Sequence, residues 1–240
     1  MRDKPIFSPA EVHVWTACLP SAPPPEIART LSPEECIRAS RFHRMVDRFR
    51  FVFAHAVLRD VLSRYLARPP GDIQFGKNSF GKPFLDQTNG GRMLEFNLSH
   101  AGGLVLVGVC ESGRVGIDVE EIRPMDDLSS IAESHYTPQE CAFIFGQAQE
   151  DQLRAFLRCW TRKEAYVKAL GKGLSIRLNS LETHIQPEPD RPSHVGAGST
   201  DGALWQLTDL DVPEGYIAAV AAETGMHRVV YFEWRRGIRQ

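Results

Sequence analysis

The sequence lacks three features that would settle its class at once: paired cysteines, a long apolar segment and a strong net charge. Its five cysteines are odd in number, widely spaced and without a C-x-x-C pair, which argues against a disulfide framework or a zinc site. The longest apolar stretch, Leu104 to Cys110, is far too short to span a bilayer. A formal net charge of −2 provides no overall field for nucleic acid or an anionic membrane. We therefore expect a cytoplasmic protein with neither of these partners.

What is present is an ordinary globular composition, 42% hydrophobic and 24% charged, with two clear helix starts. Ser32-Pro33-Glu34-Glu35 combines an N-cap, a proline at the first helical position and an acid at the third, and it predicts a long helix to about Ala67. Thr137-Pro138-Gln139-Glu140 repeats the pattern. It predicts a second helical layer that continues over residues 152–170 and ends at Gly171.

Short strands are predicted around both helical regions from runs of branched and apolar residues. We expect them near residues 12–19, 73–75, 94–98, 104–110 and 115–119, and again near 181–185, 204–207, 216–222 and 229–234. Residues 186–202 are rich in Pro, Gly, Ser and Asp and are predicted to form a mobile hairpin loop. Because helices and strands occur in two successive sets, the sequence favours an α+β fold of two halves with a similar plan.

The most informative segment is Gly116-Ile117-Asp118-Val119-Glu120, which has the alternation of a strand. Asp118 and Glu120 lie on the same side of the pleat, with Cα atoms roughly 6.6 Å apart. From there both carboxylates can converge on one hard cation, for which Mg²⁺ is the natural candidate. The alternative is a pair of solvated carboxylates on a half-exposed strand.

A second segment, residues 160–168, reads as a helix with Trp160, Glu164 and Lys168 on one face. Glu164 could supply a third carboxylate to the same cation. The alternative is a surface ion pair between Glu164 and Lys168, worth about 0.3–0.5 kcal/mol.

Together, the two segments resemble the signature of the Sfp-type 4′-phosphopantetheinyl transferases: G-I-D-V-E, followed downstream by W-T-R-K-E-A-Y-V-K-A-L-G-K-G-L. Upstream, G-K-P-F at 81–84 and F-N-L-S-H-A-G at 96–102 resemble two further elements of that family, and Ser32-Pro33-Glu34 with the helix from Arg41 to Arg59 resembles its N-terminal region. These motifs occur in the family's order and extend from residue 31 to about residue 176.

The resemblance implies two halves related by a pseudo-twofold axis, each with helices on a small, mainly antiparallel sheet and with the active site between them. Residues 1–114 would form the N-terminal half, which contacts the nucleotide of coenzyme A. Residues 115–240 would form the C-terminal half, with the metal site and the catalytic helix. The implied enzyme transfers the 4′-phosphopantetheine arm of coenzyme A to a serine of an apo acyl or peptidyl carrier protein, requires Mg²⁺ and releases 3′,5′-ADP. Two fused halves also predict a monomer.

The resemblance assigns roles to individual residues. Arg38, Arg50 and His100 would bind the 3′-phosphate of coenzyme A; Lys82, Pro83 and Ser99 would lie on the nucleotide and pyrophosphate; Lys163 and Lys168 would face the pyrophosphate or the departing phosphate. One departure from the family is Glu35, where some relatives carry a lysine for the 3′-phosphate. Arg38 and its neighbours would compensate for it, or coenzyme A would bind less tightly.

Charge placement then suggests a mechanism. Asp118, Glu120 and Glu164 would hold Mg²⁺ against the pyrophosphate, and Lys168 would stabilise the leaving phosphate. Glu164 is the candidate general base for the carrier serine, directly or through a metal-bound water. Two alternatives stay open: a coenzyme A or nucleotide-binding module without chemistry, and a Mg²⁺-dependent pyrophosphohydrolase that uses water as the acceptor.

Overall fold

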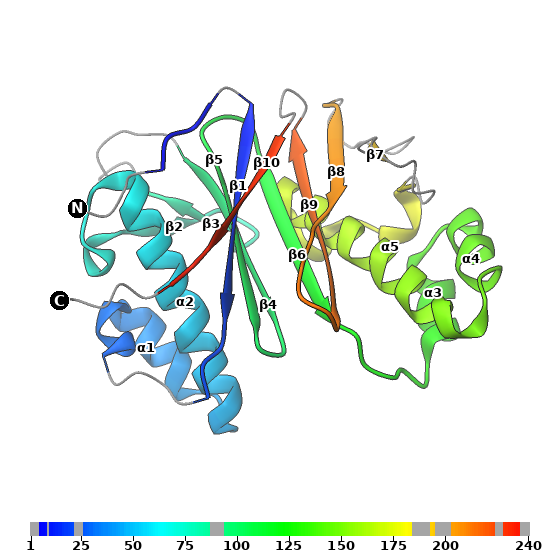
Figure 1. Ribbon diagram of the computed structural model, residues 1–240, viewed down its shortest axis with the longest axis horizontal. Helices are drawn as coiled ribbons and strands as arrows, with labels where there is room; N and C mark the ends of the chain where they lie inside the picture. Colours follow the sequence, from blue (N-terminus) through cyan, green and yellow to red (C-terminus); the bar gives the residue numbers. More distant parts are fainter. Residues whose placement is uncertain are drawn as a thin grey trace.

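The computed structural model describes residues 5–8, 10–21, 26–86, 94–183, 193–194, 203–223 and 228–235. Two sheets stand next to each other at the centre, and helices cover their outer faces (Figure 1). The first sheet has the strand order β10 (Arg228–Glu233), β1 (Glu11–Cys18), β5 (Leu104–Cys110) and β4 (Glu95–Ala101). The second has the order β6 (Val115–Glu121), β9 (Tyr216–Glu223), β8 (Trp205–Asp209) and β7 (Ser193–His194). A separate hairpin is formed by β2 (Phe75–Lys77) and β3 (Pro83–Leu85).

The helices fall into one group for each sheet (Figure 1). The first group contains α1 (Pro33–Ser40) and α2 (Met45–Leu66), and the second contains α3 (Leu128–His135), α4 (Pro138–Phe145) and α5 (Gln149–Leu170). Short 3₁₀ turns occur at η1 (Ile27–Thr30), η2 (Pro70–Asp72), η4 (Gly173–Ser175) and η5 (Leu178–Ser180). Of the helices in the described ranges, none is both long and apolar enough to cross a membrane. The predicted α+β fold is confirmed.

Apolar faces of both sheets meet to form the central core. Alternate residues of β6, namely Val115, Ile117 and Val119, are almost fully buried against β1 and β5 of the first sheet. The side-chain oxygen of Asn97 on β4 accepts a hydrogen bond of 2.9 Å from the backbone N–H of Ile117, which ties the two sheets together. The opposite face of β6 is thereby left for α5, which carries the candidate site.

Both predicted capping boxes are present, and so is the glycine stop of α5. Ser32 and Thr137 each accept from the third residue of their helix, whose acid bonds back to them. Gly171 ends α5 with φ = 65°, a left-handed conformation that glycine adopts without strain. The strands predicted near 12–19, 94–98, 104–110, 115–119, 204–207, 216–222 and 229–234 are found within a few residues of their expected bounds.

The single long helix predicted for residues 32–67 is wrong, because the chain breaks into α1 and α2 at residues 41–44. Arg44 has the extended conformation φ = −92°, ψ = 131°. The break lets Glu35 of α1 bond Arg59 of α2 at 2.8 Å. In a continuous helix, these two residues would be about 36 Å apart, because each of the 24 intervening steps rises about 1.5 Å.

The predicted division at residue 115 also needs correction, because β10 belongs to the first sheet. It pairs in parallel with β1, with Val12 opposite Val229, while the other strand pairs of the described chain are antiparallel. Residues 228–233 therefore complete the N-terminal sheet. The strand predicted at 73–75 starts two residues later, at Phe75.

Three further differences concern the second half. The strand predicted at 181–185 is not formed over residues 181–183, which follow the turn η5 and make only an isolated bridge at Thr183. Helix α3 was not predicted, and α5 begins at Gln149 rather than at residue 152. Of the loop predicted at 186–202, residues 193–194 form β7, and the rest lies outside the described residues.

Candidate active site

Strand β6 lies unusually close to helix α5 because Gly116 has no side chain. A Cβ atom at Gly116 would stand 2.0 Å from the carbonyl oxygen of Ala165 and 2.4 Å from the backbone nitrogen of Ala169. Asp118 follows on the same face of the strand, as the alternation predicts. The close approach therefore places the Asp118 carboxylate against the side chain of Lys168 on α5.

Asp118 is the centre of this arrangement and is only 4% exposed. Its Oδ1 lies 2.5 Å from the Lys168 ammonium and accepts a hydrogen bond of 3.1 Å from the Ser99 hydroxyl. Lys168 also donates to the Ser99 oxygen, at 3.1 Å. The second oxygen, Oδ2, is buried and has no hydrogen-bond partner within the described part of the chain. Burial raises the pKa of the Asp118 carboxyl group, while Lys168 acts to lower it.

The two glutamates predicted to join Asp118 lie in the same electrostatic neighbourhood. Burial, followed by the negative charge of Asp118, raises the pKa of Glu120 to about 7, although Lys168 and a hydrogen bond from Trp160 oppose the shift. Burial and the charge of Asp118 also raise the pKa of Glu164. One ammonium group thus faces three carboxyl groups, an imbalance that an additional cation would relieve.

The carboxylates are not drawn together into a closed ligand set. Among the residues that the structure describes, no three His, Cys, Asp or Glu side chains are arranged to hold a metal ion. Lys168 supplies the positive charge closest to Asp118. Even so, the unpaired Oδ2 of Asp118 and the hard oxygens of Glu120 and Glu164 are the donor types that Mg²⁺ requires.

Lys163 occupies a different environment from the one predicted. Its side chain is fully buried and forms an ion pair of 2.6 Å with Glu140. It also donates to the carbonyl oxygens of Leu178 and Leu181, at 2.7 and 2.6 Å. All three donors of the ammonium group are therefore used within the protein. This geometry contradicts the predicted contact between Lys163 and coenzyme A.

The basic residues of the N-terminal half surround a second region, beside His100 on β4. Arg38 is exposed, and its guanidinium carbon lies 5.2 Å from the centre of the Phe51 ring. Arg50 donates to Asp47 at 3.4 Å, while its Nε is buried without a partner among the described atoms. The pKa of His100 is lowered by desolvation first, and then by the positive charges of Lys168 and Arg50. His100 thus connects the basic region to the carboxylate cluster.

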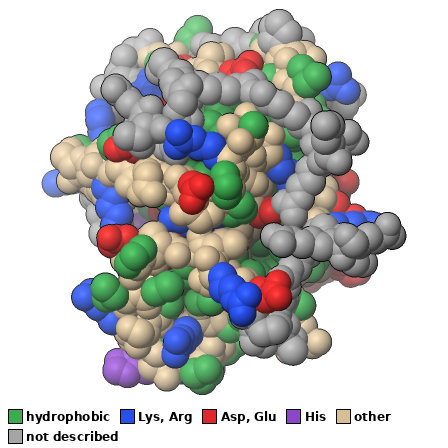
Figure 2. Space-filling view, turned by 90° about the vertical axis from the view of Figure 1, so that its left-hand side faces the viewer, with side chains coloured by type: hydrophobic (Ala, Val, Ile, Leu, Met, Phe, Trp, Pro, Cys, Tyr) green, Lys and Arg blue, Asp and Glu red, His purple; other side chains and the backbone are tan. Residues whose placement is uncertain are grey.

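The surface of this region mixes basic and hydrophobic side chains (Figure 2). Over α1, the turn that follows it and the start of α2, the exposed residues include Ile37, Arg38, Arg41, Phe42, Arg44, Met45, Val46 and Arg48. Glu35, the departure from the family pattern, does not face this surface as a free anion. Its Oε2 accepts from the backbone N–H of Ser32 and from Nε of Arg59, both at 2.8 Å, so its charge is compensated.

Lys82 and Pro83 belong to the hairpin β2–β3, which is fastened to the end of α5. The Lys82 ammonium donates to the carbonyl oxygens of Ala169 and Val115, at 2.9 and 3.2 Å, and so caps the last turn of the helix. The Lys82 ammonium also forms an ion pair of 3.9 Å with Glu95, so a ligand would compete with this carboxylate for the third donor. The Asn78 side-chain amide reinforces the attachment by donating to the carbonyl oxygen of Gly171 at 2.9 Å.

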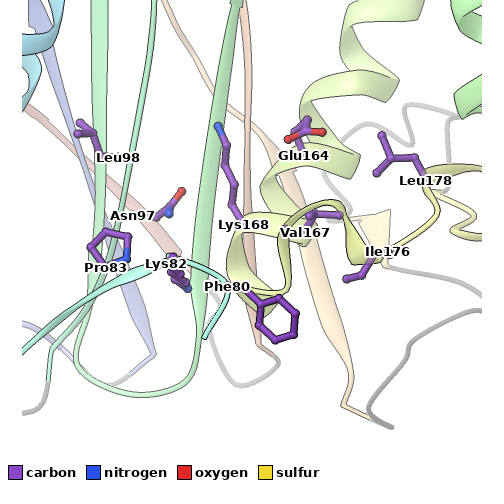
Figure 3. Close-up of a pocket in the computed structure, with 13 residues that line it drawn as sticks. Phe80, Lys82, Pro83, Asn97, Leu98, Glu164, Val167, Lys168, Ile176 and Leu178 are labelled. Carbon is purple, nitrogen blue, oxygen red and sulfur yellow. The ribbon is translucent and has the colours of Figure 1, made fainter. Parts of the chain in front are cut away.

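A cavity of about 290 Å³ opens between this hairpin and α5. Figure 3 shows the polar ends of Glu164 and Lys168 at one side of it and the apolar side chains of Phe80 and Ile176 at the other. The sequence did not predict the apolar wall of the cavity, which Leu178 extends. It also did not predict His135 of α3, which acts electrostatically on Glu164. No local pattern marks these residues, because distant turns and helices bring them to the site.

Both halves of the chain match models of one family. Residues 114–221 match the 4′-phosphopantetheinyl transferase superfamily, and residues 22–112 match the model described as 4′-phosphopantetheinyl transferase, N-terminal. The 4′-phosphopantetheinyl transferase HetI of Nostoc sp. (strain PCC 7120) is 36% identical over 88% of this chain and 87% of its own length. The 4′-phosphopantetheinyl transferase psf-1 of Bacillus pumilus is 34% identical over 72% of this chain and 76% of its own.

Among solved structures, the holo-[acyl-carrier-protein] synthase of Thermotoga maritima matches 46% of this chain and 62% of its own, with 20% identity and a TM-score of 0.36. That likeness is too weak to bear on the site. The sequence relationship is much stronger, because it extends through both halves and includes the segments that carry Asp118, Glu164 and Lys168. On this evidence the chain is an enzyme that belongs to the 4′-phosphopantetheinyl transferase superfamily.

Proposed function

We propose that this enzyme transfers the 4′-phosphopantetheine arm of coenzyme A to a serine hydroxyl of an apo carrier protein, with Mg²⁺ as cofactor, and releases 3′,5′-ADP. Enzymes of the family transfer this arm to carrier proteins. The serine acceptor, the Mg²⁺ ion and the product 3′,5′-ADP are what the proposal adds. Its main support is the buried Asp118, which bonds Lys168 and Ser99 through one oxygen and leaves the other without a partner.

The proposal includes two halves related by a pseudo-twofold axis, with the active site between them. The helical segments support it: an 8-residue helix with a capping box precedes a 22-residue helix in each half, α1 and α2 in the first, α4 and α5 in the second. The site draws Ser99 and His100 from the first half and Asp118, Glu164 and Lys168 from the second. One chain supplies both groups, which supports a monomer as the active unit.

The donor set around Asp118 fits a hard divalent cation. Asp118, Glu120 and Glu164 would hold Mg²⁺, since carboxylate oxygens are its preferred protein ligands. Burial is the main cause of the raised pKa of all three carboxyl groups, and the charge of Asp118 adds to it for both glutamates. Lys168 acts in the opposite direction without cancelling these effects. When bound there, Mg²⁺ would supply neutralisation of the negative pyrophosphate.

The chain's own residues then have separate tasks. Lys168 uses two of its donors on Asp118 and Ser99, so the third can bond the departing phosphate. Glu164 accepts the proton of the carrier serine, directly or through a water. Burial and the charge of Asp118 raise its pKa, whereas a bound cation would lower it again. The serine oxygen bonds the β-phosphorus, and the bond from that phosphorus to the bridging oxygen breaks, which frees 3′,5′-ADP.

Substrate binding is divided between the two regions. Arg38, Arg50 and His100 would hold the 3′-phosphate, because Arg50 has an unpaired Nε and acts electrostatically on His100. Lys82, Pro83 and Ser99 would contact the nucleotide and pyrophosphate. The pantetheine arm would run into the cavity beside Lys168, whose far wall is apolar. The five free cysteines are consistent with the proposed cytoplasmic location.

The decisive experiment is mass spectrometry of several purified apo carrier proteins incubated with the enzyme, coenzyme A and Mg²⁺. We expect one phosphopantetheine adduct per carrier and none when EDTA is present. Failure to modify any carrier would overturn the proposal. Release of 3′,5′-ADP without a carrier would instead identify a pyrophosphohydrolase.

Glu164→Gln tests the proposed base. We expect the turnover rate to fall by about 10²–10⁴-fold, the usual contribution of a general base, while binding of coenzyme A remains measurable by calorimetry. The matched control is Glu150→Gln, an exposed glutamate in the first turn of the same helix, which should leave turnover unchanged. Normal turnover of the Glu164 variant would remove this residue from the mechanism.

A further inference from the structure

His55 lies beside the basic region of the N-terminal half and has no role in the mechanism above. It is on α2, one turn after Phe51, and its ring lies tilted against the Phe51 ring, with centres 3.9 Å apart. The guanidinium group of Arg38 also lies against Phe51, with its carbon 5.2 Å from the ring centre. Phe51 therefore contacts both an arginine and a histidine side chain.

The orientation of the imidazole is set by one hydrogen bond. His55 Nδ1 lies 3.0 Å from the carbonyl oxygen of Phe51. Because a carbonyl oxygen can only accept, Nδ1 must carry the proton in the neutral ring. Nε2 then has a lone pair and becomes a donor only when the ring gains a second proton. This nitrogen therefore offers nothing to an anion unless the imidazole is charged.

The surroundings keep the imidazole neutral in the free enzyme. Desolvation lowers the pKa of His55 to about 4, and the positive charges of Arg38 and His100 act in the same direction. Glu35 and the Phe51 carbonyl oppose the shift. Glu35 is the stronger of the two opposing influences, although its carboxylate is already bonded to Arg59.

We propose that His55 is a fourth residue of the 3′-phosphate site, which takes up a proton from solvent when coenzyme A binds and donates Nε2–H to the phosphate. The inference rests on the proposed function, because it needs the 3′-phosphate to lie among Arg38, Arg50 and His100. A dianion at that position opposes the repulsion that holds the ring neutral and supplies the missing acceptor. Phosphate binding and protonation of His55 then favour each other.

The sign of the pH dependence follows directly. Binding raises the pKa of His55, so its contribution to coenzyme A affinity is complete below the free-enzyme pKa of about 4 and is lost as the pH rises through the raised pKa. Above that range the ring is neutral in both states, and this contribution is lost. His100 and the phosphate itself also titrate, and His100 interacts electrostatically with His55. The difference between the wild type and a variant that lacks only His55 therefore measures the contribution of His55 together with its coupling to His100.

The test is isothermal titration calorimetry of the full chain with coenzyme A and with dephospho-coenzyme A, at pH 6 and pH 8, in two buffers of different ionisation enthalpy. We expect the wild type to take up more protons than His55→Gln when coenzyme A binds at pH 6, and to bind it about twofold more tightly, because most of the gain from one charge-assisted hydrogen bond offsets the cost of protonating, at pH 6, a group whose free pKa is about 4. With dephospho-coenzyme A the two proteins should behave alike. His43→Gln, which changes an exposed histidine before α2, should match the wild type.

The variant His55→Arg carries a permanent positive charge at this position and provides a second test of the role of His55. We expect it to bind coenzyme A more tightly than His55→Gln at pH 8, with little change between pH 6 and pH 8. Equal proton uptake by the wild type and His55→Gln, or no advantage of the Arg variant over Gln at pH 8, would overturn the role of His55. In that case a retained preference for coenzyme A over dephospho-coenzyme A leaves the proposed function intact. Absence of binding of either ligand to the wild type would count against the proposed function itself.

Discussion

The two halves of the molecule use the same device to attach a long helix. In the first, the capping-box acid Glu35 bonds Arg59 of α2; in the second, the capping-box acid Glu140 bonds Lys163 of α5. Each cation also donates to two carbonyl oxygens that follow in the chain, those of Pro70 and Ile73 for Arg59 and those of Leu178 and Leu181 for Lys163. The pairs differ in burial, because Glu35 keeps 13% of its side chain exposed whereas Glu140 keeps none.

The two halves contain two kinds of basic side chain: those that hold the structure together and those that are available to bind a ligand. Arg59 and Lys163 are buried, and each donates to a glutamate and to two carbonyl oxygens of the protein. Arg38 in the first half and Lys168 in the second, which we propose contact the substrate, are more exposed. In the motif W-x-x-K-E-x-x-x-K, one lysine therefore holds the helix in place, and the other, five residues later, is the one that we propose for the chemistry.

The strongest test of this comparison is Lys163→Met, which leaves Glu140 buried and without its cation. We expect a loss of about 3–5 kcal/mol in the free energy of unfolding, the usual cost of breaking a buried ion pair. Urea denaturation provides the measurement, with the exposed Lys77→Met as control. Adding Glu140→Gln should recover part of the loss. A cost below about 1 kcal/mol would show that the pair is not a structural anchor.

Gly116→Ala tests the close contact between β6 and α5, and Gly108→Ala is its counterpart on β5. A Cβ at Gly116 would overlap the backbone of α5, whereas a Cβ at Gly108 would lie an ordinary 3.5 Å from Val115. We expect about 2–3 kcal/mol of destabilisation for Gly116→Ala, together with lower activity as Asp118 moves relative to Lys168, and less than about 1 kcal/mol for Gly108→Ala. Equal effects in denaturation curves would contradict the close approach.

Glu120→Gln tests the excess negative charge of the second half. The pKa of Glu120 is raised from 4.5 to about 7, so the protonated form is favoured in the folded enzyme. The stability that this provides is complete below pH 4.5 and is lost as the pH rises towards 7. Without divalent ions, the variant should therefore be more stable than the wild type by about 1–2 kcal/mol at pH 8, with a flatter profile. Thermal unfolding between pH 4.5 and 8 measures this, and parallel profiles would refute it.

The smallest effect is expected for Glu35→Gln in the first half. The amide oxygen can still accept from Ser32, and Arg59 keeps its two carbonyl partners. The variant should lose about 1 kcal/mol in urea denaturation, well below the loss for Lys163→Met. A loss as large as that of Lys163→Met would mean that the two attachments are equivalent despite their different burial.

Sequence patterns gave correct predictions where interactions between residues close together in the sequence determine the structure. The alternation in residues 115–119 predicted which side of β6 would carry Asp118, and the helical spacing predicted that Glu164 and Lys168 would share a face of α5. The capping boxes at Ser32 and Thr137 and the glycine stop at 171 were also correct, because each depends on backbone groups within four residues.

Sequence patterns gave wrong predictions where a contact with a residue far away in the sequence determines the structure. The break at residues 41–44 depends on the contact between Glu35 and Arg59. The transfer of β10 to the first sheet depends on its pairing with β1. The burial of Lys163 depends on Glu140, which lies on another helix.

By itself, the sequence determined the α+β composition, the main elements and the order of the family motifs, because hydrophobic periodicity and capping act over a few residues. Only the tertiary structure decided which charged side chains meet. Asp118 and Lys168 are 50 positions apart, and the absence of a side chain at Gly116 brings them to 2.5 Å. Such a pairing depends on a contact between segments that are far apart in the sequence. The free energy gained when the two segments are buried together cannot be inferred from either segment alone.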